Sequence, residues 1–300
     1  MSSTLIAASA CLTDSELRDL LLQYRRQNWA GIQTPQWQER IVDGILNDDG
    51  QVVFEPLASF WHASPASRVL DIGSGVGSFV VACRRRGLAA FGIEPERIGR
   101  GAGLTAIQIA RRRTQDSVFV AAVGERLPFP DCSFDLVCMN QVMEHVGNQI
   151  DVLREAVRVL RAGGLLYVAS PNYLRFYEPH YKIFWIPLLP KWLGSWYLRV
   201  RGRDPILLHQ LTYTTNLRLR ALFREFGADL RIIDSHREQF LSKCEHGGFL
   251  SRRAQLASRL MRVPVLGPIV RRVALLFLSV TEGGCELLAI RNPGALNPSC

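Results

Sequence analysis

The chain has 300 residues, 48% hydrophobic and 21% charged, which is ordinary for a soluble protein and enough to bury the core of one large α/β domain. Its seven cysteines are scattered, odd in number and without a C-x-x-C pair, which argues against a disulfide framework or a zinc site and for a reducing compartment. The net charge of +9 is concentrated late in the chain, because residues 1–170 hold 17 Lys/Arg against 18 Asp/Glu and residues 171–300 hold 19 against 9. This asymmetry indicates an anionic partner, namely a membrane surface, a phosphorylated substrate or nucleic acid, with a solvated basic face as the alternative.

The N-terminus has no basic leader and reaches Asp14 and Glu16 early, so no signal peptide is expected. No apolar run approaches the roughly 20 residues of a spanning helix. We therefore expect a cytoplasmic protein that can lie peripherally on the inner face of a membrane.

Residues 13–60 have helical apolar spacing, with an N-cap signal at Thr13 or Asp14, and predict an N-terminal helical cap over 1–66. From Arg68 onward, short apolar runs alternate with amphipathic segments. The predicted strands are 68–72, 89–94, 118–122, 134–139, 164–170, 228–234 and 285–290. The predicted helices are 76–86, 97–112, 148–161, which the glycines of Arg161-Ala-Gly-Gly164 should stop, and 214–226. This alternation predicts a doubly wound parallel sheet in a domain over 67–300.

Two segments interrupt the alternation. Residues 171–212 are rich in aromatic residues and proline, and residues 242–282 carry a basic amphipathic pattern. We call them the first and second insertions.

The first strand ends in Asp71 and is followed by Gly73-Ser-Gly75-Val-Gly77. Such a turn brings a ligand close to the backbone, and by itself it fits a dinucleotide equally well. Asp71 separates the two cases, because a carboxylate repels a pyrophosphate but attracts the sulfonium and ammonium of S-adenosylmethionine. Glu94 ends the second strand, where an acid accepts hydrogen bonds from ribose hydroxyls; a helix N-cap is the alternative role.

Further motifs follow in order: Val123-Gly-Glu-Arg-Leu-Pro-Phe-Pro130, Asp131-Cys-Ser-Phe-Asp-Leu-Val137 and Glu144-His-Val146. With the glycine turn, they make residues 68–170 resemble the class I S-adenosylmethionine-dependent methyltransferases of the small-molecule "type 11" kind. The resemblance implies an α/β, Rossmann-like fold with a seven-stranded, mostly parallel sheet, an antiparallel last strand and helical or aromatic insertions. It also implies S-adenosyl-L-methionine as the cofactor.

The resemblance assigns the cofactor residues by position. Asp71, Gly73 and Gly75 would hold the methionine part, Glu94 the ribose and Gly124–Glu125 the adenine edge. The remaining cofactor-binding candidates are Ser74 and Gly77 in the turn and Asn140 at the tip of the fourth strand. One position departs from the family pattern: many relatives have an acid before Gly124, and this chain has Val123.

Methyl transfer from a sulfonium is an in-line displacement in which alignment does most of the work, so no catalytic side chain is required. His180 in the first insertion, His145 after the fourth strand and His209 are the candidates for contact with the acceptor or for a base. Related quinone methyltransferases bind a metal through Glu-x-x-Glu-His, but Gln141 replaces the first acid here, so no metal is expected.

Residues 140–143 read Asn-Gln-Val-Met, not the Asn/Asp-Pro-Pro-aromatic turn that holds an extruded base, which argues against a nucleic-acid substrate. Tryptophan and tyrosine beside Lys/Arg in the first insertion are typical of a membrane interface, although both insertions could instead pack together as a lid. We therefore expect a small-molecule acceptor, or an amphiphilic one linked to a lipid or glycan. The alternatives are a cofactor-binding, membrane-associated scaffold without catalysis and a nicotinamide-dependent oxidoreductase.

Overall fold

The structure is a computed structural model that describes residues 12–28, 35–48, 50–96, 105–114, 118–233 and 284–293, with isolated residues between 259 and 272. The chain divides into two compact units, which are described separately. Unit 1 comprises residues 1–55 and 63–123, and unit 2 comprises residues 56–62 and 124–300. The division expected from the sequence, a cap over 1–66 and a domain over 67–300, stays a prediction.

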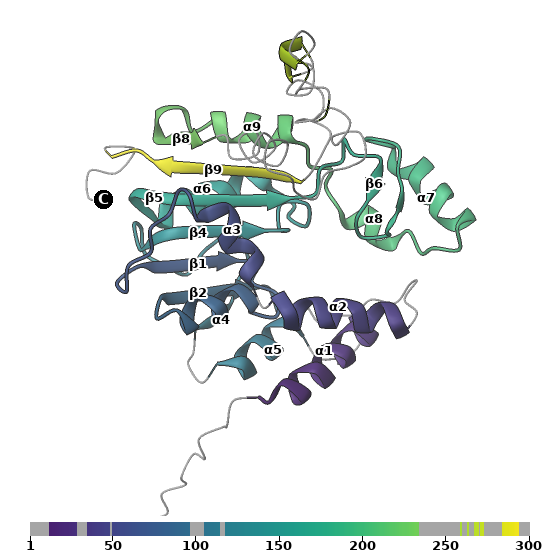
Figure 1. The fold of residues 1–300 in the computed structure, drawn as a ribbon, viewed down its shortest axis with the longest axis horizontal. Helices are drawn as coiled ribbons and strands as arrows, with labels where there is room; N and C mark the ends of the chain where they lie inside the picture. Colours follow the sequence, from purple (N-terminus) through teal and green to yellow (C-terminus); the bar gives the residue numbers. More distant parts are fainter. Residues whose placement is uncertain are drawn as a thin grey trace, which may run out of the picture. The chain divides into compact units, whose positions relative to one another are not determined.

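The central element is a seven-stranded sheet of order β3-β2-β1-β4-β5-β9-β8 (Figure 1). Its strands are β1 Arg68–Ile72, β2 Ala89–Glu94, β3 Phe119–Ala121, β4 Phe134–Asn140, β5 Leu160–Ser170, β8 Leu230–Ile233 and β9 Cys285–Arg291. β1, β2 and β3 pair in parallel, as do β4 and β5, whereas β9 is antiparallel to both β5 and β8. The predicted α/β fold, a mostly parallel seven-stranded sheet with an antiparallel last strand, is therefore confirmed.

Unit 1 contains several helices besides its strands. They are α1 Asp14–Asn28, α2 Pro35–Asp48, the 3-10 turn η1 Gln51–Val53, α4 Ser78–Arg85 and α5 Ala106–Arg113; the short helix α3 Phe54–Leu57 follows η1, begins in unit 1 and ends in unit 2 along the chain. The predicted N-cap of α1 is present, because the Thr13 hydroxyl accepts from the Glu16 amide and the Thr13 amide donates to the Glu16 carboxylate at 2.8 Å.

The apolar face of α1 packs against α2, α5 and the glycine turn of unit 1. Leu17 and Leu21 form one cluster with Val42 of α2 and Ile109 of α5, and Val76 of the glycine turn packs against it. In Figure 1, α1, α2 and α5 lie side by side. The N-terminal helices are therefore attached to the segment that holds the predicted cofactor turn.

Unit 2 contains α6 Gln149–Val159, α9 Asn216–Arg224 and the 3-10 turn η2 Gly227–Asp229 beside its strands. The first insertion forms the hairpin β6 Tyr177–Glu178 and β7 Ile183–Phe184, followed by α7 Lys191–Val200 and α8 Ile206–Gln210, at one end of this unit (Figure 1).

The first insertion has a core of its own. Trp185 is fully buried among Tyr181, Ile183, Leu198 and Leu208. Gly194 of α7 contacts its ring so closely that a Cβ there would lie 2.7 Å from Trp185 Cη2. The aromatic residues predicted to face a membrane thus fall into two groups, since Trp185 packs inward and others remain exposed.

One expectation needs correction. The helix predicted over 148–161 ends at Val159, and residues 160–170 form β5, so Gly163 and Gly164 do not stop a helix. These glycines lie instead where the β4–β5 register shifts between Phe134 and Leu136, and Gly163 has a φ of +74° there. Residues 97–104 of the helix predicted over 97–112, and most of the second insertion, lie outside the described residues. No described helix is long and apolar enough to cross a membrane.

Candidate functional site

The glycine turn after β1 is held by backbone hydrogen bonds to the neighbouring strand. The amides of Gly73 and Ser74 both donate to the Ile93 carbonyl at 2.8 Å. Gly73, Gly75 and Gly77 all have positive φ, between 54° and 82°. The turn therefore needs glycine for its conformation, and at Gly77 also for space, because a Cβ would lie 2.6 Å from Cζ of Phe119.

A buried arginine fixes the far side of this turn. Arg113, in the last turn of α5, donates to the Val76 carbonyl at 2.9 Å and to the Ser78 hydroxyl at 3.0 Å. Helix α5 itself starts at a capping box formed by Thr105 and Gln108. The turn is thus preorganised before any ligand arrives.

Two carboxylates flank the turn. Asp71 on β1 is buried, and burial together with the charge of Glu94 raises the pKa of Asp71 to about 8. Glu94 at the end of β2 accepts a hydrogen bond from the Gly75 amide, with 3.0 Å between N and Oε2. A Cβ on Gly75 would meet nothing within 4 Å, so the backbone there borders open space. Two carboxyl groups beside an open backbone favour a cationic ligand, because a nearby positive charge stabilises the ionised form of both.

Two more groups complete the site in unit 1. The Ser74 hydroxyl is buried and has no hydrogen-bond partner among the described residues. Burial raises the pKa of Tyr24 on α1, and the Glu94 carboxylate raises it further, so this phenol lies within electrostatic reach of Glu94. No motif in the sequence signals a role for Tyr24 beside this site.

The other predicted cofactor residues lie in unit 2. Asn140 is the last residue of β4 and is half-buried, and the next residue, Gln141, has a φ of +59°. Gly124 and Glu125 are half-buried in a turn, and Val123 just before them is exposed. Their contacts with the cofactor stay predictions.

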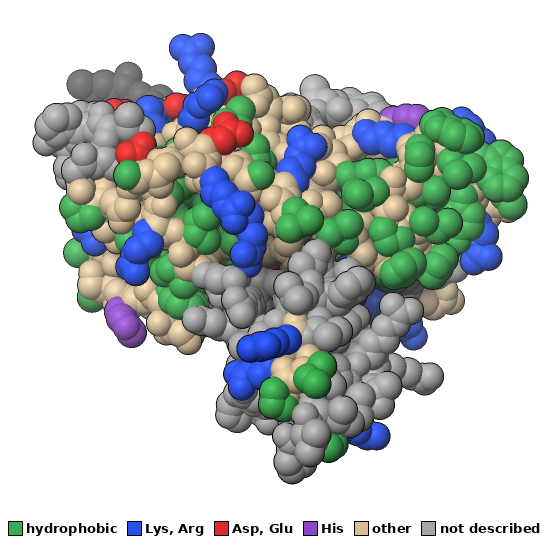
Figure 2. All heavy atoms as spheres, turned by 90° about the horizontal axis from the view of Figure 1, so that it is seen from above, with side chains coloured by type: hydrophobic (Ala, Val, Ile, Leu, Met, Phe, Trp, Pro, Cys, Tyr) green, Lys and Arg blue, Asp and Glu red, His purple; other side chains and the backbone are tan. Residues whose placement is uncertain are grey.

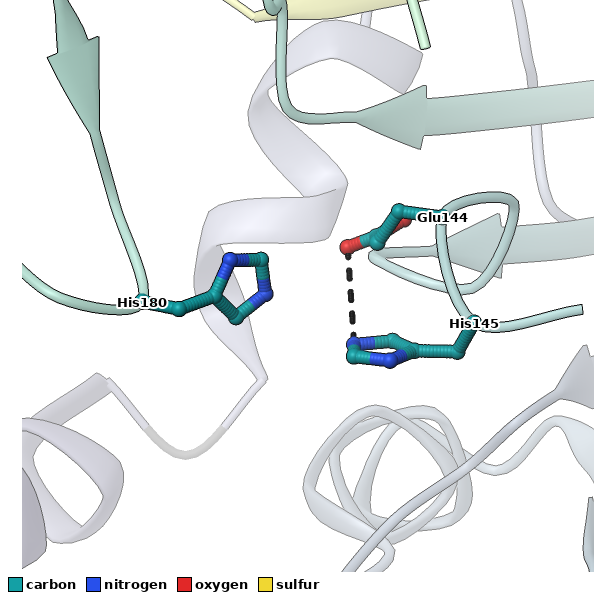
Figure 3. Close-up of side chains that lie close together, drawn as sticks. All are labelled: Glu144, His145 and His180. Carbon is teal, nitrogen blue, oxygen red and sulfur yellow. Dashed lines mark ion pairs between the residues drawn. The ribbon is translucent and has the colours of Figure 1, made fainter. Parts of the chain in front are cut away.

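Two of the three candidate histidines meet in unit 2. Glu144 and His145, from the β4–α6 connection, lie beside His180, from the turn between β6 and β7 (Figure 3). The rings of His145 and His180 are edge-to-face with their centroids 5.5 Å apart, and His145 Nε2 is 3.8 Å from Glu144 Oε1. Burial raises the pKa of Glu144 to about 7, against the lowering effect of its hydrogen bond from Ser170.

Glu178 is a buried partner that the sequence analysis did not single out. Its Oε1 lies 2.8 Å from His180 Nδ1 and 3.3 Å from the Tyr173 hydroxyl, which donates to it, and its Oε2 accepts from the Tyr181 amide at 2.6 Å. The signal was the acid two residues before His180, separated from it by a proline.

The third candidate, His209, is not a member of this cluster. Its Nε2 lies 2.9 Å from the Ser195 hydroxyl, and its carbonyl accepts from Lys191, so it connects α8 to α7. Its predicted role toward the acceptor is untested.

Residues 70–168 match the family model described as "Methyltransferase domain". This segment is a methyltransferase domain.

Curated relatives match part of this chain. The chain is 35% identical over 142 residues to an uncharacterized methyltransferase of Mycobacterium sp. (strain KMS), covering 46% of this chain and 52% of the relative. It is 35% identical over 128 residues to a probable S-adenosylmethionine-dependent methyltransferase of Mycobacterium tuberculosis (strain CDC 1551 / Oshkosh), covering 42% of each. It is 35% identical over 127 residues to a demethylmenaquinone methyltransferase of Tropheryma whipplei (strain Twist), covering 41% of this chain and 50% of the relative. The chain thus spans about half the length of the curated relatives it matches.

Proposed function

We propose that this chain transfers a methyl group from S-adenosylmethionine to a small or amphiphilic acceptor. The observation that carries the proposal is the pair Asp71 and Glu94 beside the open backbone of Gly75. In its ionised form the buried Asp71 carboxylate repels a pyrophosphate, whereas the sulfonium and ammonium of S-adenosylmethionine stabilise that form. The Glu94 carboxylate, which accepts from the Gly75 amide, is also the type of group that accepts hydrogen bonds from ribose hydroxyls.

In this assignment Asp71, Gly73, Ser74, Gly75 and Gly77 bind the methionine part of the cofactor. The unpartnered Ser74 hydroxyl supports this role, because a buried hydroxyl is stable when a ligand supplies its hydrogen bond. Glu94 binds the ribose, Gly124 and Glu125 the adenine, and Asn140 the methionine part or the acceptor. The chain's contribution to methyl transfer is alignment, since the sulfonium already carries an activated leaving group.

Calorimetry and methyl labelling together test this function. We expect the chain to bind S-adenosylhomocysteine and not a nicotinamide cofactor, and to move labelled methyl from S-adenosylmethionine into a crude lipid and glycan extract. Binding without labelling would favour the scaffold without catalysis. Binding of the nicotinamide cofactor alone would overturn the proposal in favour of an oxidoreductase.

For the acceptor, we propose an amphiphile met at an anionic membrane surface. Along residues 181–186 inward and outward side chains alternate, which leaves Phe184 and Ile186 exposed, and α7 exposes Trp192 (72%) and Trp196 (60%) one turn apart. Figure 2 shows this hydrophobic surface on the right, with Lys and Arg side chains at its edge. Indole rings at headgroup depth with cations on phosphates are typical of proteins that lie on membranes. The demethylmenaquinone methyltransferase among the relatives supports a small molecule as acceptor.

Changing both Trp192 and Trp196 to serine should lower sedimentation with anionic vesicles at low salt at least tenfold. Each indole buried in the interface contributes about 1.5–3 kcal/mol, and the two changes leave the core of the first insertion intact. Leu217→Ser is the matched control, because Leu217 is equally exposed but lies on α9. A wild-type chain that never sediments with anionic vesicles would refute membrane docking while leaving the methyltransferase proposal untouched.

A further inference from the structure

Three metal-ligand atoms converge in unit 2 from two separate segments of the chain. One carboxylate oxygen of Glu144 and one ring nitrogen each of His145 and His180 lie within 4.8 Å of one another. Figure 3 shows the His180 ring turned toward the other two side chains. The sequence predicts no metal because Gln141 replaces an acid, but His180 supplies a ligand that no local motif contains.

The orientation of His180 suits a ligand role. Its Nδ1 bonds to the Glu178 carboxylate, so this nitrogen carries the proton and Nε2 keeps a lone pair for the cluster. Glu178 is fully buried and is itself fixed by Tyr173 and by the Tyr181 amide. A carboxylate behind the imidazole is the usual support of metal-binding histidines, because it fixes the ring and increases its basicity.

The buried side chain of Glu144 also suits the role of a metal ligand. Its Oε2 accepts from the Ser170 hydroxyl at 2.9 Å, but its Oε1 is buried and has no hydrogen-bond partner among the described residues. The carbonyl of Glu144 accepts from the Thr212 amide, and the carbonyl of the preceding residue, Met143, accepts from the Gln149 side chain. The loop thus holds a buried carboxylate oxygen toward two imidazoles. Burial of an ionised carboxylate is costly unless a cation offsets it.

We propose that Glu144 Oε1, His145 Nε2 and His180 Nε2 bind a divalent transition-metal ion of the zinc type. One carboxylate oxygen and two imidazole nitrogens are donors that suit Zn²⁺ better than Mg²⁺ or Ca²⁺, which prefer oxygen ligands only. Three protein ligands leave a fourth position for water or for an oxygen atom of a bound molecule, as in open zinc sites.

The cluster can close around an ion with small movements. Ligand atoms at about 2.0–2.2 Å from a tetrahedral ion lie about 3.4 Å apart, compared with 3.8 Å between Glu144 Oε1 and His145 Nε2. His145 is the adjustable ligand, because its side chain is 37% exposed, and it also gives the ion a path from solvent. Glu144 and His180 are held by Ser170 and Glu178, so His145 completes the site.

Titration of the chelator-treated full chain with ZnCl₂ or CoCl₂, without S-adenosylmethionine, tests the proposal. The wild type should bind one equivalent that resists a competing chelator, and Co²⁺ should develop the visible absorption of a four-coordinate ion. His180→Ala and Glu144→Gln should each weaken this binding at least a hundredfold. His145→Ala should do the same, and because His145 is partly exposed this variant keeps the fold if either of the others does not.

Two further variants separate a metal site from general effects. Glu178→Gln keeps the size of the side chain but weakens the support of His180, so the affinity should fall about tenfold. His62→Ala, at an exposed histidine elsewhere in unit 2, should leave the affinity unchanged. Equal binding by wild type, His145→Ala and His180→Ala, or no binding by the wild type, would overturn the proposal. Neither outcome affects cofactor binding, which calorimetry with S-adenosylhomocysteine measures separately.

Discussion

Asp71→Asn is expected to weaken binding of S-adenosylhomocysteine about a hundredfold at pH 8. The change keeps the size of a buried side chain and removes the negative charge that would face the ligand's ammonium group. A hydrogen bond to a charged partner contributes about 1.5–3 kcal/mol, and about 2.7 kcal/mol corresponds to a factor of a hundred.

The same residue predicts a pH dependence. Burial and Glu94 raise the pKa of Asp71 to about 8 in the free protein, so below pH 8 a cationic ligand must first displace a proton. The affinity of the wild type should therefore rise by up to tenfold per pH unit between about pH 6 and pH 8 and level off above, and Asp71→Asn should lack this slope. Calorimetry at each pH measures both proteins, and they should converge near pH 6.

Adenosine is the matched control ligand, because it has neither the ammonium nor the sulfur centre, and its affinity should not change with pH over this range.

The stability of the ligand-free protein gives an independent check. Because the folded pKa is raised above the unfolded value of about 3.9, the stability that protonated Asp71 contributes is complete below that value and is lost as the pH rises through 8. Asp71→Asn should thus be more stable than the wild type above pH 8, and a less stable variant would contradict the assignment.

Trp185→Ala should destabilise the first insertion by about 3–5 kcal/mol. The ring is fully buried among Tyr181, Leu198 and Leu208, so its removal leaves a cavity that the surrounding elements fill only in part. We expect the loss to be local, since this core consists of insertion residues. Hydrogen exchange should show that Trp185→Ala loses more amide protection, relative to the wild type, in α7 and α8 than in α6.

Trp192→Ala is the matched control for this prediction. The same residue type is removed from the same segment, but Trp192 is exposed, so its effect on stability should stay within about 0.5 kcal/mol. Equal protection of α7 in Trp185→Ala and wild type would show that the insertion depends on contacts other than this core.

The sheet was the part most open to prediction from sequence. β1 and β2 begin and end where their apolar runs do, because turn residues flank both runs. The start of β5 was missed because Gly163 and Gly164 have the same signal after a helix and in an irregular strand pairing, and only the pairing with β4 distinguishes the two.

The positions of the glycine turn after β1 and of Glu94 at the end of β2 could be predicted, because each follows from a few consecutive residues. The Glu144, His145 and His180 cluster was not, because it depends on how the first insertion folds back on the β4–α6 connection. Glu178 likewise became recognisable only through its bonds to His180, Tyr173 and Tyr181. Sequence spacing thus identifies groups that act within one turn and misses groups that tertiary folding assembles.

The bonds from Arg113 to the glycine turn have a dynamic consequence. Since the last turn of α5 bonds to the Val76 carbonyl and the Ser78 hydroxyl, local opening of α5 must break the contacts that shape the turn. A ligand that requires the closed turn therefore binds only the closed α5, and by mass action it lowers the population of the open helix by the factor 1 + L/Kd, where L is the concentration of free ligand. Ligand binding at the glycine turn should therefore slow amide hydrogen exchange in α5, even if this helix does not contact the ligand.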